Sequence, residues 1–535
     1  MPLAIKLKVP FGMLAAFAVL LGAVCGNTVS VSAQSGDAWF GLDMPKMREQ
    51  QSREDRTTYQ NPDIAPLSLK SPEPGDLYLN ITGEDVHRFL QDIMNVTDQY
   101  RPKGERFWGR IAGSRAEIET GNYMAQKFKE FGLKEVRTEP VQGGKQWWPL
   151  DWEVTLIGHT AYGSETKDVT LTSAFPALQL KTGALSVLGL EAELVHVGRG
   201  HMVDFLGRDV TGKIAVMHAA LQPNPFFQSA RGHVENAIDA GAVGVLTVMD
   251  APGNHQYALE DMGPPDVPSF LLGGDDGRFL EGVMAAAGSS NPLKVRISLE
   301  AEVRESWRGN NVLGLIPGQS DEYIVLIAHL DGYFHSANDN GAGLASLLAL
   351  AKYYSRSGAQ QPKRNLLFVG TSGHHEFSDG VEALMANHPE IMEKIVLVFN
   401  IEHPSSVMSY FRGPLKFHNR ISAGQLMSLN TEGIRTLTIS NGNPLLVAFF
   451  HEAIDYYGLV VNSLLRRQPS GDASGFYRAG HTVVQIPLQN LWYHSSGDRI
   501  DTIQASGLER ATRLYAFVLD KIDGVSRADL ERSAP

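Results

Sequence analysis

The residues with the clearest chemical potential are His374, His375 and Glu376, which follow one another just past an apolar stretch. Imidazole nitrogens and carboxylate oxygens bind metal ions and accept protons. More side chains of these kinds come after other apolar stretches: His329, Asp331, Asp339, Glu402 and His494. Their combination is typical of a hydrolytic zinc site, because a carboxylate can bridge two ions while imidazoles complete the coordination of each.

Taken one at a time, these residues have ordinary explanations. Asp339 could cap the helix that follows it, and His329 could be a hydrogen-bonded histidine of the core. Glu402 could be a solvated loop carboxylate, and His494 could pack against its aromatic neighbours. The joint pattern favours a metal site over these separate explanations. Four other histidines match no such position and are interpreted as ordinary: His335, His388, His403 and His451.

Several other catalytic motifs are missing from the sequence. Asp379 stands where an H-E-x-x-H zinc motif beginning at His375 needs its second histidine. Neither a G-x-S-x-G nucleophile motif nor a Walker phosphate loop occurs. The single cysteine, Cys25, lies in the N-terminal segment. With that segment removed, no thiolate remains to bind zinc, attack a substrate or form a disulfide.

The elements that must position these side chains follow a regular alternation after residue 310. Apolar runs at 323–328, 366–369, 395–399 and 483–486 predict buried strands, and the pattern at 341–354 predicts an amphipathic helix. Together they indicate an α/β fold with a mostly parallel central sheet and helices on both faces. Ligands gather at the carboxyl ends of such strands. The candidate residues stand at those ends.

The rest of the chain differs in character. Residues 84–136 have a largely helical pattern, clearest at 116–131. A β-rich segment follows, with short strands expected at 192–197, 213–217, 244–248 and 294–299 and one helix at 233–240. Residues 34–83 are rich in Pro, Asp, Ser and Gln and are expected to form a poorly ordered lead-in.

Charge and the N-terminus indicate where the protein works. A net charge of -12 with no basic block argues against nucleic acid or an anionic membrane as the partner. Lys6 and Lys8 precede an apolar run at 11–24, and small residues at 31–33 offer a cleavage point. This layout predicts a signal peptide at 1–33. We therefore expect a secreted protein, extracellular or periplasmic, with no stable membrane insertion of the mature chain.

Several motifs, in order, resemble the M28 family of zinc peptidases. They are His329-Leu330-Asp331, the A-N-D-N-G-A-G run at 337–343, Ser470-Gly471-Asp472 and the Y-H-S-S-G-D run at 493–498. Runs at 209–216 and 240–244 resemble an inserted protease-associated (PA) domain. The resemblance implies a peptidase domain built from 84–165 and 301–525, a PA-like insert at 166–300 and a tail at 526–535.

The resemblance also implies roles for the candidate residues. One Zn²⁺ would be held by His329, Asp339 and Glu402, and a second by Asp339 together with His375 and His494. Asp331 would orient His329. The implied activity is hydrolysis of a peptide or protein substrate, as an aminopeptidase or another exopeptidase, with two zinc ions per chain.

Two adjacent positions depart from the family pattern. The two consecutive glutamates of the family fall on His374-His375, which removes a carboxylate ligand and weakens the second zinc site. It also removes the usual general base, because an imidazole beside a dication is a poor proton acceptor. The sequence leaves open whether His374, Glu376 or neither accepts the proton. The alternatives are a catalytically impaired homologue that serves as a binding or receptor module, and an enzyme for a non-peptide substrate.

Overall fold

The structure is a computed structural model. It describes residues 38–39, 42–43, 78–162, 167–178, 186–219, 228–251, 253–259, 267–288, 290–412, 425–433, 435–488 and 492–532. Residues 1–56 and 57–535 form two separate compact units. In the first unit, the described elements are strands β1 (Ala38–Trp39) and β2 (Leu42–Asp43), which pair antiparallel. The predicted signal peptide at 1–33 lies outside the described residues, as does most of the lead-in.

The site sheet, in the second unit, carries the strands predicted after residue 310. Its eight described strands lie in the order β21-β20-β22-β17-β14-β16-β13-β4. Their bounds are β4 (Lys134–Gly143), β13 (Trp307–Ile316), β14 (Tyr323–His329), β16 (Asn365–Thr371), β17 (Ile395–Asn400), β20 (Arg435–Ile439), β21 (Val461–Leu465) and β22 (Val483–Gln485). The four central strands β16, β14, β17 and β22 are mutually parallel. This confirms the predicted α/β fold.

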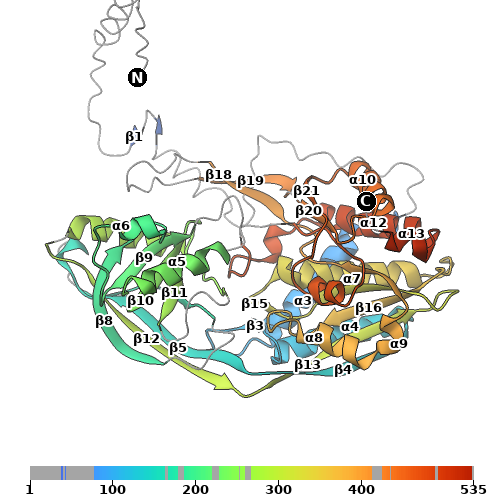
Figure 1. The fold of residues 1–535 in the computed structure, drawn as a ribbon, viewed down its shortest axis with the longest axis horizontal. Helices are drawn as coiled ribbons and strands as arrows, with labels where there is room; N and C mark the ends of the chain where they lie inside the picture. Colours follow the sequence, from blue (N-terminus) through green and yellow to red (C-terminus); the bar gives the residue numbers. More distant parts are fainter. Residues whose placement is uncertain are drawn as a thin grey trace, which may run out of the picture. The chain divides into compact units, whose positions relative to one another are not determined.

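Helices cover both faces of the site sheet (Figure 1). Leu326 and Ala328 of β14 face a core shared with α3, α4, α7, α10 and α12, whereas Val325 and Ile327 face a second core with α8, α9 and α11. Alternate residues of a strand point to opposite faces, so a strand apolar throughout is buried on both. The bounds are α3 (Gly83–Gln99), α4 (Arg115–Glu130), α7 (Ala342–Ser355), α8 (Asp379–Asn387), α9 (Pro389–Met392), α10 (Pro444–Tyr457), α11 (Ala473–Arg478), α12 (Ala505–Asp523) and α13 (Arg527–Glu531).

The insert sheet has eight described strands in the order β6-β5-β12-β8-β9-β10-β11-β7. Their bounds are β5 (Gln146–Leu156), β6 (Val169–Thr170), β7 (Phe175–Pro176), β8 (Val187–His196), β9 (Ile214–Ala219), β10 (Gly244–Met249), β11 (Ser269–Leu272) and β12 (Lys294–Arg304). Two helices belong to the same region, α5 (Gln228–Asp239) and α6 (Gly274–Ala287). We call residues 146–304 the insert.

Shorter elements complete the described chain. Strand β3 (Gly109–Arg110) pairs with β15 (Gly332–Tyr333), and β18 (Val407–Arg412) pairs with β19 (Gln425–Glu432). Single helical turns lie at Thr160–Tyr162, Met202–Phe205, Ala337–Gly341 and Ile500–Thr502. Among the described residues, no helix is both long enough and apolar enough to cross a membrane.

Three details differ from the sequence predictions. Helix α6 lies in a segment for which only strands and turns were expected, because its apolar positions are interrupted by Gly274, Gly277 and Gly282. Strand β5 pairs with β12 and so lies in the insert sheet, although 146–156 was assigned to the N-terminal part of the peptidase domain. The predicted tail at 526–535 contains helix α13. The division into domains is otherwise kept as a proposal.

Candidate metal centre

Three neighbouring parallel strands bring the predicted site residues to one edge of the site sheet. His329 is the last residue of β14 and pairs with Thr371, the last residue of β16. Ile327 pairs with Asn400, the last residue of β17. The ends of β14 and β16 are therefore level, and β17 ends opposite a residue two positions before the end of β14. The loops that follow them carry 374–376 and Glu402 to the same place, as expected for parallel strands.

Asp339 lies in the turn Ala337–Gly341, directly before α7. The carboxylate of Asp498 accepts hydrogen bonds from the backbone N–H groups of Asn338 and Asp339, at 2.9 and 3.1 Å. Helix α7 begins after Gly341 and has no side-chain cap. The side chain of Asp339 is therefore not a helix cap, and it faces the histidines of the site instead.

The first group of ligand atoms surrounds Oδ1 of Asp339. His329 Nε2 lies 3.1 Å from this oxygen and 3.7 Å from Oε1 of Glu402. The other ring nitrogen of His329, Nδ1, donates to the backbone carbonyl of Asp331 at 3.0 Å. A proton on Nδ1 leaves the lone pair of Nε2 directed into the site. The predicted set of His329, Asp339 and Glu402 is thus brought together.

The second group surrounds Oδ2 of the same carboxylate. His494 Nε2 lies 3.0 Å from this oxygen, and His375 Nε2 lies 3.9 Å from it. The three ligand atoms lie within 4.8 Å of one another, and all three residues are buried. Asp339 therefore presents one oxygen to each group. This is the arrangement expected of a bridging carboxylate.

His374 forms a group with His329 and Glu402, although the sequence analysis considered it only as a base. Its ring stacks on that of His329 at 4.0 Å between centroids, and its Nε2 lies 3.6 Å from Oε1 of Glu402. Its Nδ1 donates to Asp472 Oδ1 at 3.0 Å. Histidines that bind a metal usually have the other ring nitrogen held by a carboxylate in this way. The geometry suits a ligand better than a proton acceptor.

The sequence analysis left two residues of the site out. His403 was interpreted as ordinary, but its Nε2 lies 2.9 Å from Asp339 Oδ1. Its place directly after Glu402, at the end of a strand, was the available signal. Asp472 was quoted only as part of a motif, and it holds His374 and accepts a hydrogen bond from Thr371 Oγ1. Its partners are about a hundred residues away in sequence, so no local pattern points to them.

Asp331 positions the loop as well as His329. Its two carboxylate oxygens accept the backbone N–H groups of His374 and His375, at 3.1 and 2.9 Å. Glu376, the other candidate base, is buried and accepts a hydrogen bond from Gln146 Nε2 at 3.0 Å. Among the described residues, the groups able to hold a metal do not include Glu376.

The electrostatics of the metal-free site favour positive charge. Burial would raise the pKa of Asp339, but the imidazoles of His403 and His329 outweigh it and hold that pKa well below its ordinary value. Burial and the neighbouring His329 would lower the pKa of His374, but Asp472 and Glu402 raise it to about 9. Asp339 is thus charged and is balanced by protonated imidazoles. Bound cations would replace those protons.

The donors present fit zinc. His329 Nε2 and Asp339 Oδ2 are buried and make no well-aligned hydrogen bond within the described chain. Both groups combine imidazole nitrogens with carboxylate oxygens, the ligands that zinc takes in hydrolytic enzymes. The additional imidazoles of His374 and His403 offer donors that the predicted set lacked. The first group thereby gains ligands, while the second keeps a single carboxylate, that of Asp339.

Residues 311–519 match peptidase family M28. This part of the chain belongs to that family. The M28 region runs from within β13 into α12 and contains every candidate ligand. The resemblance drawn from the sequence motifs is thereby confirmed. The PA-like character of residues 166–300, which lie within the insert, stays a prediction.

Two solved structures share the fold beyond the M28 region. The peptidase M28 precursor from Shewanella amazonensis SB2B has a TM-score of 0.61 at 18% identity, and the likeness covers 85% of this chain and 98% of that one. A zinc aminopeptidase from Bacillus subtilis has a TM-score of 0.57 at 16% identity, covering 84% and 98%. At such identities, the likeness establishes the fold alone.

A curated relative matches a shorter part of the chain. The minor extracellular protease Vpr of Bacillus subtilis is 32% identical over 108 residues, which cover 20% of this chain and 12% of that protein. The chain therefore spans only a small part of this relative.

A strand-like segment of the insert contacts the backbone that carries His494. The N–H of Ala258 donates to the carbonyl of His494 at 2.8 Å, and the N–H of Ser496 donates to the carbonyl of Gln256 at 2.9 Å. Trp492 shares a buried cluster with residues of this segment. The insert thus helps to place one of the candidate ligands of the M28 region.

Proposed function

We propose that the chain is a zinc-dependent metallopeptidase that removes residues from the end of a peptide or protein. The observation that carries this proposal is the position of Asp339, whose two oxygens face two different groups of buried ligand atoms. The fold shared with a zinc aminopeptidase from Bacillus subtilis supports an aminopeptidase. Two Zn²⁺ per chain follow from the two groups.

The proposal assigns a separate role to each residue of the centre. His329, Asp339 and Glu402 would hold one ion, with His374 beside Glu402, and Asp339, His375 and His494 would hold the other. Bound zinc supplies Lewis acidity toward a peptide carbonyl and lowers the pKa of water. Asp331 and Asp498 fix the two loops through backbone N–H groups, so the ligand atoms are placed before any ion binds. Glu376 is the remaining candidate for the proton acceptor.

The place of action is part of the same proposal. The charged, apolar and small-residue regions of 1–33 support export, and so does the partial likeness to an extracellular protease. The insert, proposed to be PA-like, contacts the segment of His494 and would limit which substrates reach the centre.

Removal of one ligand tests the proposal. We expect His329→Ala to lose zinc and to lower peptide hydrolysis by at least about a thousandfold, because transition-state stabilisation depends on the bound ion. The measurements are zinc per chain by elemental analysis and release of product from unblocked and N-acetylated peptides. An aminopeptidase cleaves only the unblocked series.

His451→Ala is the matched control, since His451 is exposed on α10, away from the centre. The control should retain both zinc and activity. A wild-type chain that binds two zinc ions but cleaves no peptide of a broad panel would refute the peptidase, and one that binds no zinc would refute the metal centre.

A second function is favoured by one observation. Both ring nitrogens of His374 face carboxylates, and the family resemblance predicts a base glutamate at this position. A chain so altered would bind peptides without cleaving them, as a receptor-type module.

His374→Glu separates the two functions. If the wild-type chain is a disarmed homologue, the variant should gain hydrolysis, because the carboxylate restores a proton acceptor. If His374 is a ligand of a working enzyme, the variant should lose activity and bind zinc less tightly. The comparison needs kcat and zinc content of both proteins, with Glu376→Gln as a parallel test of the other candidate base.

A further inference from the structure

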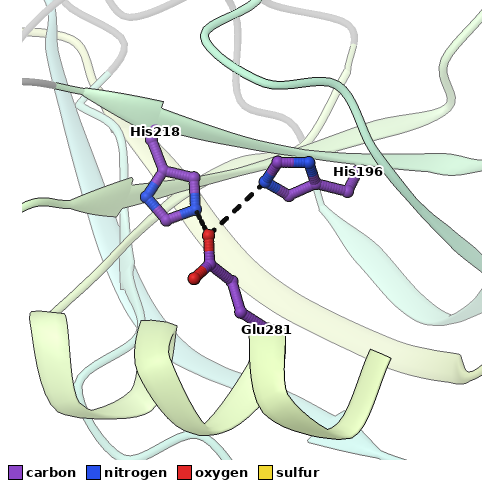
Figure 2. A group of neighbouring side chains, drawn as sticks. All are labelled: His196, His218 and Glu281. Atoms are coloured by element: carbon purple, nitrogen blue, oxygen red, sulfur yellow. Dashed lines mark ion pairs between the residues drawn. The ribbon is translucent and has the colours of Figure 1, made fainter. Parts of the chain in front are cut away.

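We propose that His196, His218 and Glu281 form a second kind of divalent-cation site, located in the insert and separate from the candidate metal centre, and that Zn²⁺ is the ion that fits it. Their ligand atoms lie within 4.8 Å of one another. Figure 2 shows the two rings and the carboxylate converging on one point.

The two imidazoles meet because of the strand register. His196 is the last residue of β8 and pairs with Val216 of the parallel strand β9. His218 lies two residues further along β9, so it projects from the same face of the sheet as the partner of His196. The ring centroids are 5.4 Å apart. Helix α6 carries Glu281 over this face (Figure 2).

The three ligand atoms share one small volume. Glu281 Oε1 lies 2.5 Å from His218 Nε2 and 3.5 Å from His196 Nε2. The side chain of His218 is fully buried, and those of His196 and Glu281 are 26% and 12% exposed. Both Nε2 atoms are buried, and neither makes a hydrogen bond of acceptable alignment within the described chain. One carboxylate oxygen therefore faces two nitrogen atoms that have no aligned partner.

Asp250 prepares His218 for metal binding. Its carboxylate oxygen Oδ1 lies 2.7 Å from Nδ1 of His218, which can donate to it. A neutral imidazole with its proton on Nδ1 presents the lone pair of Nε2 to Glu281. Nε2 of His218 and Oε1 of Glu281 then face each other with lone pairs at 2.5 Å, so positive charge is needed between them. The same carboxylate–histidine pairing holds the histidine ligands of zinc sites.

Protonation of His218 is the competing source of that charge. Burial would lower the pKa of His218, but its contacts with Asp250 and Glu281 outweigh it and raise that pKa. An imidazolium would satisfy Asp250 and Glu281, yet it leaves Nε2 of His196 without an aligned bond. One bound cation would satisfy all three residues. Its binding requires a proton on Nδ1 of His196, which breaks a long contact of 3.4 Å from the N–H of Gly198.

The donor set selects the ion. Two imidazoles and one carboxylate are ligands of zinc and other first-row transition metals, whereas calcium and magnesium prefer sets made of oxygen. The three protein donors leave a coordination position for water. A bound ion would tie α6 to β8 and β9, so it would stabilise the insert.

Counting zinc in ligand variants tests the site. The exported chain is stripped with a chelator, reloaded with Zn²⁺, desalted and analysed for zinc per chain. His196→Ala and Glu281→Gln should each bind about one Zn²⁺ fewer than the wild type, because two donors hold zinc poorly. Glu281→Gln keeps the size of the side chain, so it reports on coordination even where the histidine variant folds badly.

His201→Ala is the control, because His201 is an exposed histidine of the same insert outside the group. It should bind as much zinc as the wild type. A zinc-dependent rise in the Tm of the His329→Ala chain that Glu281→Gln removes would support the site independently of the M28 centre. Equal zinc content in the wild type and both ligand variants would overturn it, and would leave a protonated His218 as the explanation.

Discussion

At the scale of single residues, the hydrogen bonds of each histidine decide its role. Nδ1 of His329 donates a hydrogen bond to a backbone carbonyl, and Nδ1 of His374 donates one to Asp472. Both Nε2 atoms are therefore directed toward Glu402. If His374 and His375 stand where the family has two glutamates, as the sequence predicts, the chain keeps ligand atoms at this place but lacks both carboxylates. The consequence falls on proton transfer more than on metal binding, since imidazole is a good zinc ligand.

Glu117 of α4 gives a prediction on pH. It is 1% exposed, accepts the hydroxyl of Ser372 at 2.6 Å, and has its pKa raised from 4.5 to about 8 by burial and by the charge of Asp331. The carboxyl group of Glu117 has a higher pKa in the folded than in the unfolded protein, so its protonated form stabilises the fold. This contribution is complete below the unfolded-state pKa and is lost as the pH rises through the folded-state pKa. Between these pH values, the contribution of Glu117 to the free energy of unfolding should fall by about 1.4 kcal/mol per pH unit.

Glu117→Gln should remove this dependence, because an amide does not ionise. The measurement is urea unfolding of the metal-free chain at several pH values between about 5 and about 8. Glu119→Gln, on the exposed side of the same helix, should behave as the wild type. Identical pH slopes for wild type and Glu117→Gln would show that Glu117 is ionised in the folded protein.

At the scale of elements, the predicted strands were confirmed because their sequences leave few alternatives. Runs such as 323–328 and 395–399 are apolar throughout and too short for a typical buried helix, so they favour strands with both faces covered. Their register then aligns the strand ends that carry the ligands. Helix α6 was missed, since three glycines obscure its period. The loop after β16 depends on one further glycine.

Gly373 has a φ of +73°, and a Cβ at this position would collide with the ring of Trp307. We expect Gly373→Ala to displace the loop that carries His374 and His375, so that zinc content and activity both fall. Gly132→Ala is the matched control, with a φ of +83° and open space around it. The control should lose only about 1 kcal/mol of stability through its backbone conformation. Equal zinc content in the two variants would contradict this role of Gly373.

At the scale of the whole chain, the insert and the M28 region share a buried cluster at Trp492. This side chain is 2% exposed, and its ring lies 4.7 Å from that of His255. Nearby, the backbone N–H of Ala258 in the insert donates a hydrogen bond to the carbonyl of His494. A candidate ligand of the centre therefore depends on contacts with residues more than two hundred positions away in the sequence.

Trp492→Ala should test this dependence. Its cavity should cost about 3–5 kcal/mol of stability. The loss of the fixed position of His494 should lower kcat/KM by at least about tenfold. Trp152→Ala is the control: it removes an equally buried tryptophan of the insert, whose indole N–H donates a hydrogen bond to the carbonyl of Ala174. It should destabilise the protein by a similar amount and keep its zinc and activity. Equal effects of both variants on kcat/KM would refute the coupling.

The sequence by itself determined the four central strands of the site sheet and pointed to the candidate ligands that end or follow them. Both depend on local patterns, namely apolar runs and the residues after them. Only the tertiary structure decided that His374 joins His329 and Glu402, that His403 and Asp472 belong to the site, that β5 belongs to the insert sheet, and that His196 and His218 meet Glu281. These contacts join residues far apart in the chain, and no periodicity encodes the direction in which a side chain meets another element.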